Sequence, residues 1–234
     1  MRSRIALVIG LGLLTALVGA SCVVSPQPSP PEATLVGDLI GLSPGVELVA
    51  AVIGFQGGPG AVDPPEGVVL VTNLTGTDPP SIADVAADGS FVIAVPGQPG
   101  QSFRFQAKSG NTRSQPVDIE VGSSGAGISA VDTGSACLVI DPAAWVSFDR
   151  EGELRSVVLQ NRCEGVATLK APRLRRGLGG FSFSSVSTVG VPAGSVATIS
   201  VQAGPGSEPE DVLLLDVTAP FTATRAITLT VSDR

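Results

Sequence analysis

The side chains with the clearest chemical potential in this chain are its three cysteines, Cys22, Cys137 and Cys163. A thiol can carry a lipid, close a disulfide or ligate a metal. The 234 residues contain no histidine, so no Ser-His-Asp or Cys-His catalytic unit can be built, and zinc lacks its usual ligands. The sequence therefore predicts a protein that is not an enzyme and that needs neither a metal nor a cofactor.

Carboxylate chemistry is the remaining enzymatic alternative. Glu208 and Glu210 could serve a glycosidase as a pair. Both lie in a Gly/Pro-rich loop with no sign of burial, which favours a solvated loop. Asp88-Gly89 is typical of a tight turn between strands rather than of a calcium loop, and Lys108-Ser109-Gly110 likewise favours a hairpin turn.

The one basic cluster consists of Arg173, Arg175 and Arg176. It is a candidate interaction patch for an acidic partner or for anionic lipid headgroups. The alternative is a solvated face. The chain as a whole carries a net charge of −7 and only 4% aromatic residues, which argues against a nucleic-acid partner because phosphate contacts need clustered cations and base stacking needs aromatics.

The N-terminus has the pattern of an export signal. Arg2 and Arg4 precede an apolar run over residues 5–18, which is short for a spanning helix, and Gly19-Ala20-Ser21 lead to Cys22. This resembles a bacterial lipoprotein signal with its lipobox, and the resemblance implies that residues 1–21 are removed and that Cys22 receives a lipid. The family prefers Leu where this chain has Gly19. There are two alternatives: an ordinary signal peptidase cleaves the chain nearby, or the segment stays uncleaved as a membrane anchor.

A proline-rich stretch follows the signal. Residues 22–33 form a Pro/Ser tether that can become neither a helix nor a central strand, so it would hold the folded part a few nanometres from a membrane. In lipoproteins, a residue other than Asp after the lipidated cysteine favours the outer membrane, and here that residue is Val23.

The rest of the chain predicts an all-β fold. With 29 Gly and 19 Pro, short strands alternate with turns, and no stretch after residue 22 has helical periodicity. Residues 34–122 form the first expected β-sandwich. The stretches 60–65, 69–73, 87–91, 97–107 and 110–117 resemble bacterial immunoglobulin-like domains, in order and in spacing.

A second sandwich is expected over residues 130–234, after a flexible Gly/Ser linker at 123–129. Pro142, Phe148, Asn161 and the turn at 191–194 resemble the immunoglobulin-like domains of abnormal-spindle and hydin-type proteins. The family often has Gly after that Phe, where this chain has Asp149. The run Val212-Leu213-Leu214-Leu215 predicts a central strand or one that is covered on both faces.

Cys137 and Cys163 flank two strands that are joined by a turn, and antiparallel pairing brings the outer ends of such strands together. The sequence therefore predicts a structural disulfide, which leaves Cys22 for the lipid. A redox or metal-binding pair is the less favoured alternative.

These features together predict a lipid-anchored protein of the bacterial cell envelope with a structural or adhesive role. Its expected partners are a membrane, through the lipid, and a protein or polysaccharide. The alternative is an accessory binding subunit of an envelope secretion, assembly or hydrolytic complex.

Overall fold

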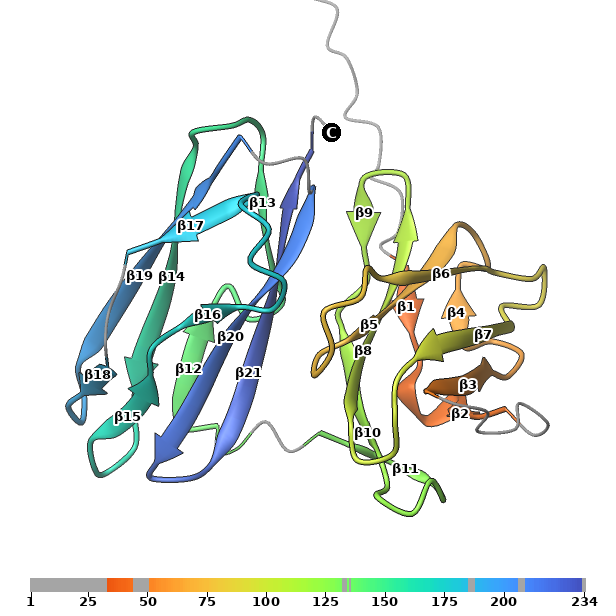
Figure 1. The fold of residues 1–234 in the computed structure, drawn as a ribbon, viewed down its shortest axis with the longest axis horizontal. Helices are drawn as coiled ribbons and strands as arrows, with labels where there is room; N and C mark the ends of the chain where they lie inside the picture. The colour runs from red at the N-terminus through yellow and green to blue at the C-terminus, as the bar shows by residue number, and fades with distance from the viewer. Residues whose placement is uncertain are drawn as a thin grey trace, which may run out of the picture. The chain divides into compact units, whose positions relative to one another are not determined.

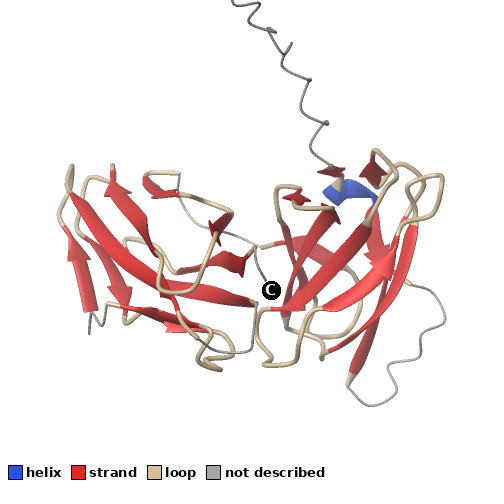
Figure 2. Cartoon of the chain, turned by 90° about the horizontal axis from the view of Figure 1, so that it is seen from above, coloured by secondary structure: helices blue, strands red, loops and turns tan. Residues whose placement is uncertain are grey.

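A computed structural model describes residues 33–43, 51–131, 134, 136–184, 188–205 and 209–232. The predicted all-β fold is confirmed: strands dominate the described residues, and their helical content is one short 3-10 turn, η1 (Gly37–Leu39) (Figure 2). Cys22, the predicted signal at 1–21 and residues 22–32 of the predicted tether lie outside the described residues. So does Glu208. Ala33, predicted as the last residue of the tether, is instead buried in the core of the first sandwich.

The first sandwich pairs a large sheet with a small one (Figure 1). The large sheet has the order β11-β10-β8-β5-β6, with β9 paired to β8; the small sheet has the order β2-β3-β7, and β1 pairs with β4. The strands are β1 (Thr34–Leu35), β2 (Ile40–Leu42), β3 (Val52–Gly57), β4 (Val62–Asp63), β5 (Val68–Asn73), β6 (Ser81–Asp84), β7 (Phe91–Pro96), β8 (Ser102–Ser109), β9 (Thr112–Arg113), β10 (Val117–Val121) and β11 (Ile128–Ala130).

Alternation of apolar and polar residues builds the core of this sandwich. In β7, Phe91, Ile93 and Val95 are buried while their neighbours are exposed, as the period-2 geometry of a strand requires. Phe55 of the small sheet packs edge-on against Phe103 of the large sheet, with ring centroids 5.0 Å apart. Such aromatic pairs add about 0.5–1.5 kcal/mol beyond the burial of their area.

The second sandwich also has two sheets, of order β12-β14-β19-β17 and β13-β21-β20-β15-β18, with β16 paired to β20. Its strands are β12 (Leu138–Asp141), β13 (Trp145–Phe148), β14 (Leu154–Asn161), β15 (Ala167–Lys170), β16 (Arg173–Leu174), β17 (Phe181–Phe183), β18 (Thr188–Val191), β19 (Val196–Ala203), β20 (Glu210–Ala219) and β21 (Ala223–Val231). β13 runs parallel to β21.

Strand β20 is buried on both faces, as its continuous apolar run predicts. Leu213, Leu215 and Val217 enter the core of the second sandwich. Val212 and Leu214 point the other way and are equally buried, in a separate apolar cluster. A covered outer face is what turns an alternating strand pattern into a continuous one.

Both predicted turns are confirmed. Lys108 pairs with Arg113 and Ser109 with Thr112, so the chain reverses as a hairpin after Ser109. At the other turn, the carboxylate of Asp88 accepts hydrogen bonds from the hydroxyl and the backbone N–H of Ser90. Both bonds lower the pKa of Asp88, and the bond from the hydroxyl has the larger effect.

Gly89 is required at the second turn because its φ is +81° and a Cβ there would lie 2.5 Å from the carbonyl oxygen of Val62. Gly89→Ala is expected to destabilise the protein by about 1–3 kcal/mol, since a strained backbone and a clash combine. Gly110→Ala is the matched control: its φ is also positive, at +56°, but a Cβ would meet nothing within 4 Å. Chemical denaturation of both variants checks the difference, and equal losses would contradict the steric argument.

The expected flexible linker at 123–129 is a hairpin instead. The N–H of Gly122 donates to the carbonyl of Gly127, and Val121 then pairs with Ile128. Residues 128–130 therefore continue the large sheet of the first sandwich as β11. The glycines serve a tight turn, with positive φ at Gly125 and Gly127, and not a hinge.

Candidate functional site

The predicted disulfide is confirmed. Cys137 and Cys163 are bonded, with Cα atoms 4.8 Å apart, at the joined ends of β12 and β14. The neighbouring Asn161 is fully buried: its amide donates to the carbonyls of Gly165 and Val191, and its oxygen accepts the N–H of Cys163. The disulfide and this amide together close one end of the second sandwich.

Removing the disulfide by Cys137→Ser with Cys163→Ser is expected to lower the free energy of unfolding by about 3.5 kcal/mol, because the unfolded chain regains the entropy of a loop with a sequence separation of 26. Urea denaturation of the double variant checks this value. A loss below about 1 kcal/mol would mean that the bond contributes little to the fold.

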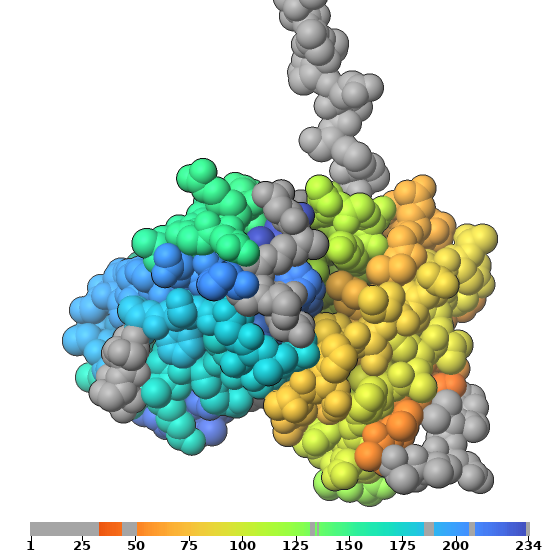
Figure 3. Space-filling model, turned by 45° about the horizontal axis from the view of Figure 1, so that its top comes forward, coloured from red at the N-terminus to blue at the C-terminus, as the bar shows by residue number. Residues whose placement is uncertain are grey.

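The most distinctive surface of the described chain lies where the two sandwiches meet. The outer face of the β5/β8 sheet contacts the outer face of the β20/β21 sheet, and the space-filling view shows the two bodies in contact (Figures 1 and 3). Where they touch, the two sheets are thus covered on both faces. The alternation in β8 predicts a strand half-buried with its polar face in solvent; instead Arg104 and Gln106 are each only 3% exposed.

A small apolar cluster lies in this interface. Leu74, directly after β5, packs with Val212 and Leu214 of β20 and with Ala226 of β21. These side chains belong to neither sandwich core. Their burial excludes water from the polar groups beside them, which strengthens the electrostatic interactions there.

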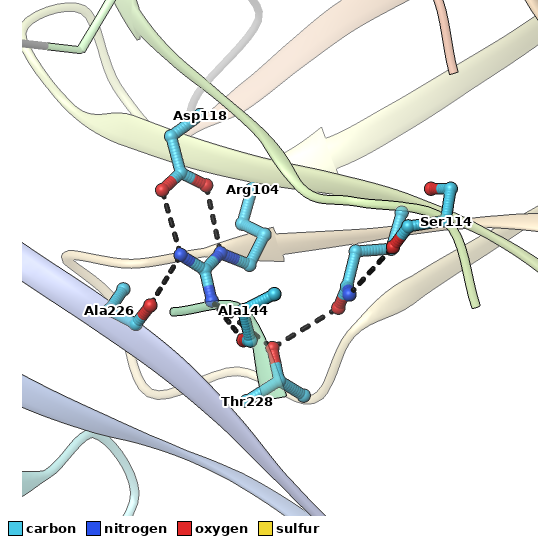
Figure 4. A network of polar contacts seen from close by, with 7 residues as sticks. Arg104, Ser114, Asp118, Ala144, Ala226 and Thr228 are labelled. Atoms are coloured by element: carbon cyan, nitrogen blue, oxygen red, sulfur yellow. Dashed lines mark hydrogen bonds and ion pairs between the residues drawn. The ribbon is translucent and has the colours of Figure 1, made fainter. Parts of the chain in front are cut away.

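Arg104 is the centre of the polar part of the interface (Figure 4). Its Nε and Nη2 each donate to a carboxylate oxygen of Asp118 at 2.8 Å, in the bidentate geometry of a strong ion pair. Nη2 also donates to the carbonyl of Ala226, and Nη1 donates to the carbonyl of Ala144 and the hydroxyl of Thr228. One side chain of the first sandwich thereby binds three residues of the second.

The network continues beyond Arg104. The hydroxyl of Thr228 donates to the amide oxygen of Gln106, whose nitrogen donates to the carbonyl of Ser114. At another point, Arg113 of β9 forms an ion pair with Glu210 of β20. Glu210 is thus a structural ion-pair partner, in contrast to the solvated loop residue that its sequence context predicts.

Arg175 reaches in the opposite direction, from the second sandwich into the first. Its Nη1 donates to the carbonyls of Asn73, Gly76 and Asp78 at 2.9–3.0 Å. Burial lowers the pKa of the Arg175 guanidinium, and the carboxylate of Asp211 opposes that shift. An arginine stays charged under such conditions, so its hydrogen bonds to these three carbonyls are charge-assisted.

The arginine cluster is therefore not one exposed patch. Arg175 is only 6% exposed, which corrects its prediction as an interaction residue. The backbone N–H of Arg176 donates to buried Asp211, so its loop is held against β20. Arg173 is more than half exposed and forms an ion pair with Asp216. Of the three, Arg173 retains the exposure that an interaction patch needs.

Among the described residues, no group of three or more His, Cys, Asp or Glu side chains has the arrangement of a metal site. Within the same residues, no helix has the length and hydropathy needed to cross a membrane.

The sequence matches no protein-family profile and no curated protein. Solved structures resemble it only distantly. WR4, a C. elegans MSP family member, shares 12% identity at a TM-score of 0.35, over 42% of this chain and 99% of its own. The Yersinia pseudotuberculosis adhesin InvE shares 15% identity at a TM-score of 0.25, over 76% of this chain and 53% of its own. These similarities are too weak to carry a functional argument.

Proposed function

We propose that this chain is a non-enzymatic lipoprotein of a bacterial cell envelope, anchored through Cys22, with a structural or adhesive role. The observation that carries the proposal is the interface described above. Arg104 and Arg175 cross it in opposite directions, and each donates hydrogen bonds to backbone carbonyls of the other sandwich. A body with a fixed geometry presents its surface without the entropic cost of ordering two domains when a partner binds.

The tether supplies the second part of the proposal. Residues 22–33 are rich in proline, and an extended proline-rich chain spans about 3.1 Å per residue. A lipid at Cys22 would therefore hold the two-sandwich body some 30–40 Å from the bilayer. At that distance a protein or polysaccharide partner could reach every exposed face. Val23 favours the outer membrane as the site of anchoring.

Mass spectrometry of the mature N-terminus tests the anchor. The proposal expects the first residue to be Cys22 and to carry a diacylglyceryl group. Cys22→Ala should abolish the diacylglyceryl group, whereas Ser25→Ala, in the same tether, should leave it in place. A mature N-terminus at any other residue would overturn the lipoprotein assignment.

The binding role is tested by chemical cross-linking on intact membranes. A structural or adhesive protein is expected to cross-link to polysaccharide or to several neighbours. One stoichiometric protein complex would instead favour the accessory-subunit alternative. Turnover of a glycan that is lost in Glu210→Gln would contradict a non-enzymatic role.

A further inference from the structure

A second feature of the junction is a polar cleft of about 190 Å³ at the β8–β9 hairpin. Arg104 does not line this cleft, whereas Ser232, the last described residue, does. The first sandwich lines it with Lys108, Asn111 and Arg113, and the second with Ser147, Pro209, Glu210, Thr230, Val231 and Ser232.

Two cations stand side by side in the wall of this cleft. Lys108 and Arg113 are directly opposite each other in the β8–β9 pair, so their side chains share one face of the hairpin. Like charges in such a cross-strand position destabilise a sheet. Lys108 is one of only two lysines in a chain whose net charge is −7, so the pair stands out against an acidic background.

One nitrogen of the Arg113 guanidinium group has no hydrogen-bond partner among the described residues. It is 9% exposed, and its Nη2 forms the ion pair with Glu210. Its Nη1 has essentially no solvent-exposed surface and has no hydrogen-bond acceptor among the described residues. Leaving a buried N–H group unpaired is unfavourable, and more so when the group is charged.

Three hydroxyl groups also line the cleft, those of Ser147, Thr230 and Ser232. Glu210 pairs with Thr230, and Thr230 pairs with Ser147, so the three residues lie side by side across β20, β21 and β13. The hydroxyl of Ser147 lies 3.0 Å from that of Ser232. Each hydroxyl has one O–H donor that can rotate toward an oxyanion.

We propose that this cleft binds an oxyanion group, a phosphate or a carboxylate, with Lys108 and Arg113 supplying the charge and Ser147, Thr230 and Ser232 supplying hydroxyl donors. Two cations against one carboxylate leave a net positive site. Glu210 holds Arg113 by one nitrogen and repels the incoming anion, so it limits the affinity. The inference does not depend on the lipid anchor or on the envelope role.

Equilibrium dialysis of the full-length protein in detergent, with inorganic phosphate at constant ionic strength, tests the site. Saturable binding of one phosphate per chain is expected. Lys108→Met should weaken binding at least fivefold, and Glu210→Gln should strengthen it several-fold, because the glutamine oxygen still accepts from Arg113 without repelling the ligand. A parallel titration with acetate distinguishes a carboxylate ligand from a phosphate ligand.

Lys170→Met is the matched control, since it removes the other lysine, on β15, which does not line the cleft. Its phosphate affinity should equal that of the unmodified protein. Thermal unfolding of each variant identifies any that fail to fold, and Glu210→Gln remains informative in that case because it predicts a gain. Absence of saturable phosphate and acetate binding, or equal losses in the two lysine variants, would overturn the proposal.

Discussion

Asp118→Ala is expected to lower the free energy of unfolding by about 3–5 kcal/mol, because it leaves the Arg104 guanidinium buried without its counter-charge. The side chains of Arg104 and Asp118 are 4% and 14% exposed, so water can replace the carboxylate only in part. The carbonyls of Ala144 and Ala226 would still accept from Arg104, but neither carries a charge. Guanidinium chloride denaturation measures the loss.

The matched control for this prediction is the exposed pair between Arg155 and Asp149. Their side chains are 44% and 79% exposed, and Arg155 also pairs with Glu153. Asp149→Ala should therefore change stability by less than about 0.5 kcal/mol. If Asp118→Ala costs no more than this control, Arg104 does not depend on its ion pair, and the interface is not held as described.

Leu214→Lys is the second variant with a large expected effect, and it separates the interface from the cores. Leu214 is 1% exposed and packs between the sandwiches, whereas Leu213 and Leu215 face the core of the second sandwich. A cation at this position would lie opposite Arg173 and beside Ala226, with no carboxylate in the apolar cluster to pair with it. We expect a loss of at least about 3 kcal/mol, since apolar burial is replaced by an unpaired charge.

The loss can arise because the two sandwiches separate or because the second sandwich itself is destabilised. Differential scanning calorimetry distinguishes these two causes. The unmodified protein should unfold in one transition, and Leu214→Lys in two, because each sandwich keeps its own core. Leu178→Lys, the same exchange at a position that is 54% exposed, should leave the single transition unchanged. A single, merely lowered transition in Leu214→Lys would indicate that the residue supports the fold of its own sandwich.

Much of the fold could be predicted from local patterns. Alternation in Phe91, Ile93 and Val95, together with the turn at Asp88-Gly89, identifies strands and their connection because both signals lie within a few residues. The disulfide could be predicted because an antiparallel pair brings its outer ends together. The all-β architecture follows from many such short-range signals.

The interface could not be predicted in the same way, because it joins residues far apart in the chain. Arg104 and Thr228 are 124 positions apart, and nothing in the sequence of β8 distinguishes an arginine in solvent from one beneath a second sandwich. The one available signal was the unbroken run from Val212 to Leu215, which indicates a strand covered on both faces. That run identifies the surface of the second sandwich that is covered, but it does not identify the surface that covers it.

The exposure of an arginine could not be predicted from composition where its hydrogen-bond partner is a backbone carbonyl. The cluster Arg173, Arg175 and Arg176 suggests a basic surface because three charges are counted together. Arg175 instead donates to carbonyls around residues 73–78, which no charge pattern reveals. The Gly-rich stretch at 122–127 predicts a flexible linker but forms a hairpin, since glycine is suited to both.

Residual dipolar couplings of backbone N–H groups in a weakly aligned sample test most directly whether the two sandwiches form one body. If Arg104 and Arg175 fix the interface, couplings from residues 51–131 and from residues 137–232 fit a single alignment tensor. Two tensors of different magnitude or orientation would mean that the sandwiches move independently, and would contradict a fixed interface and a fixed binding surface.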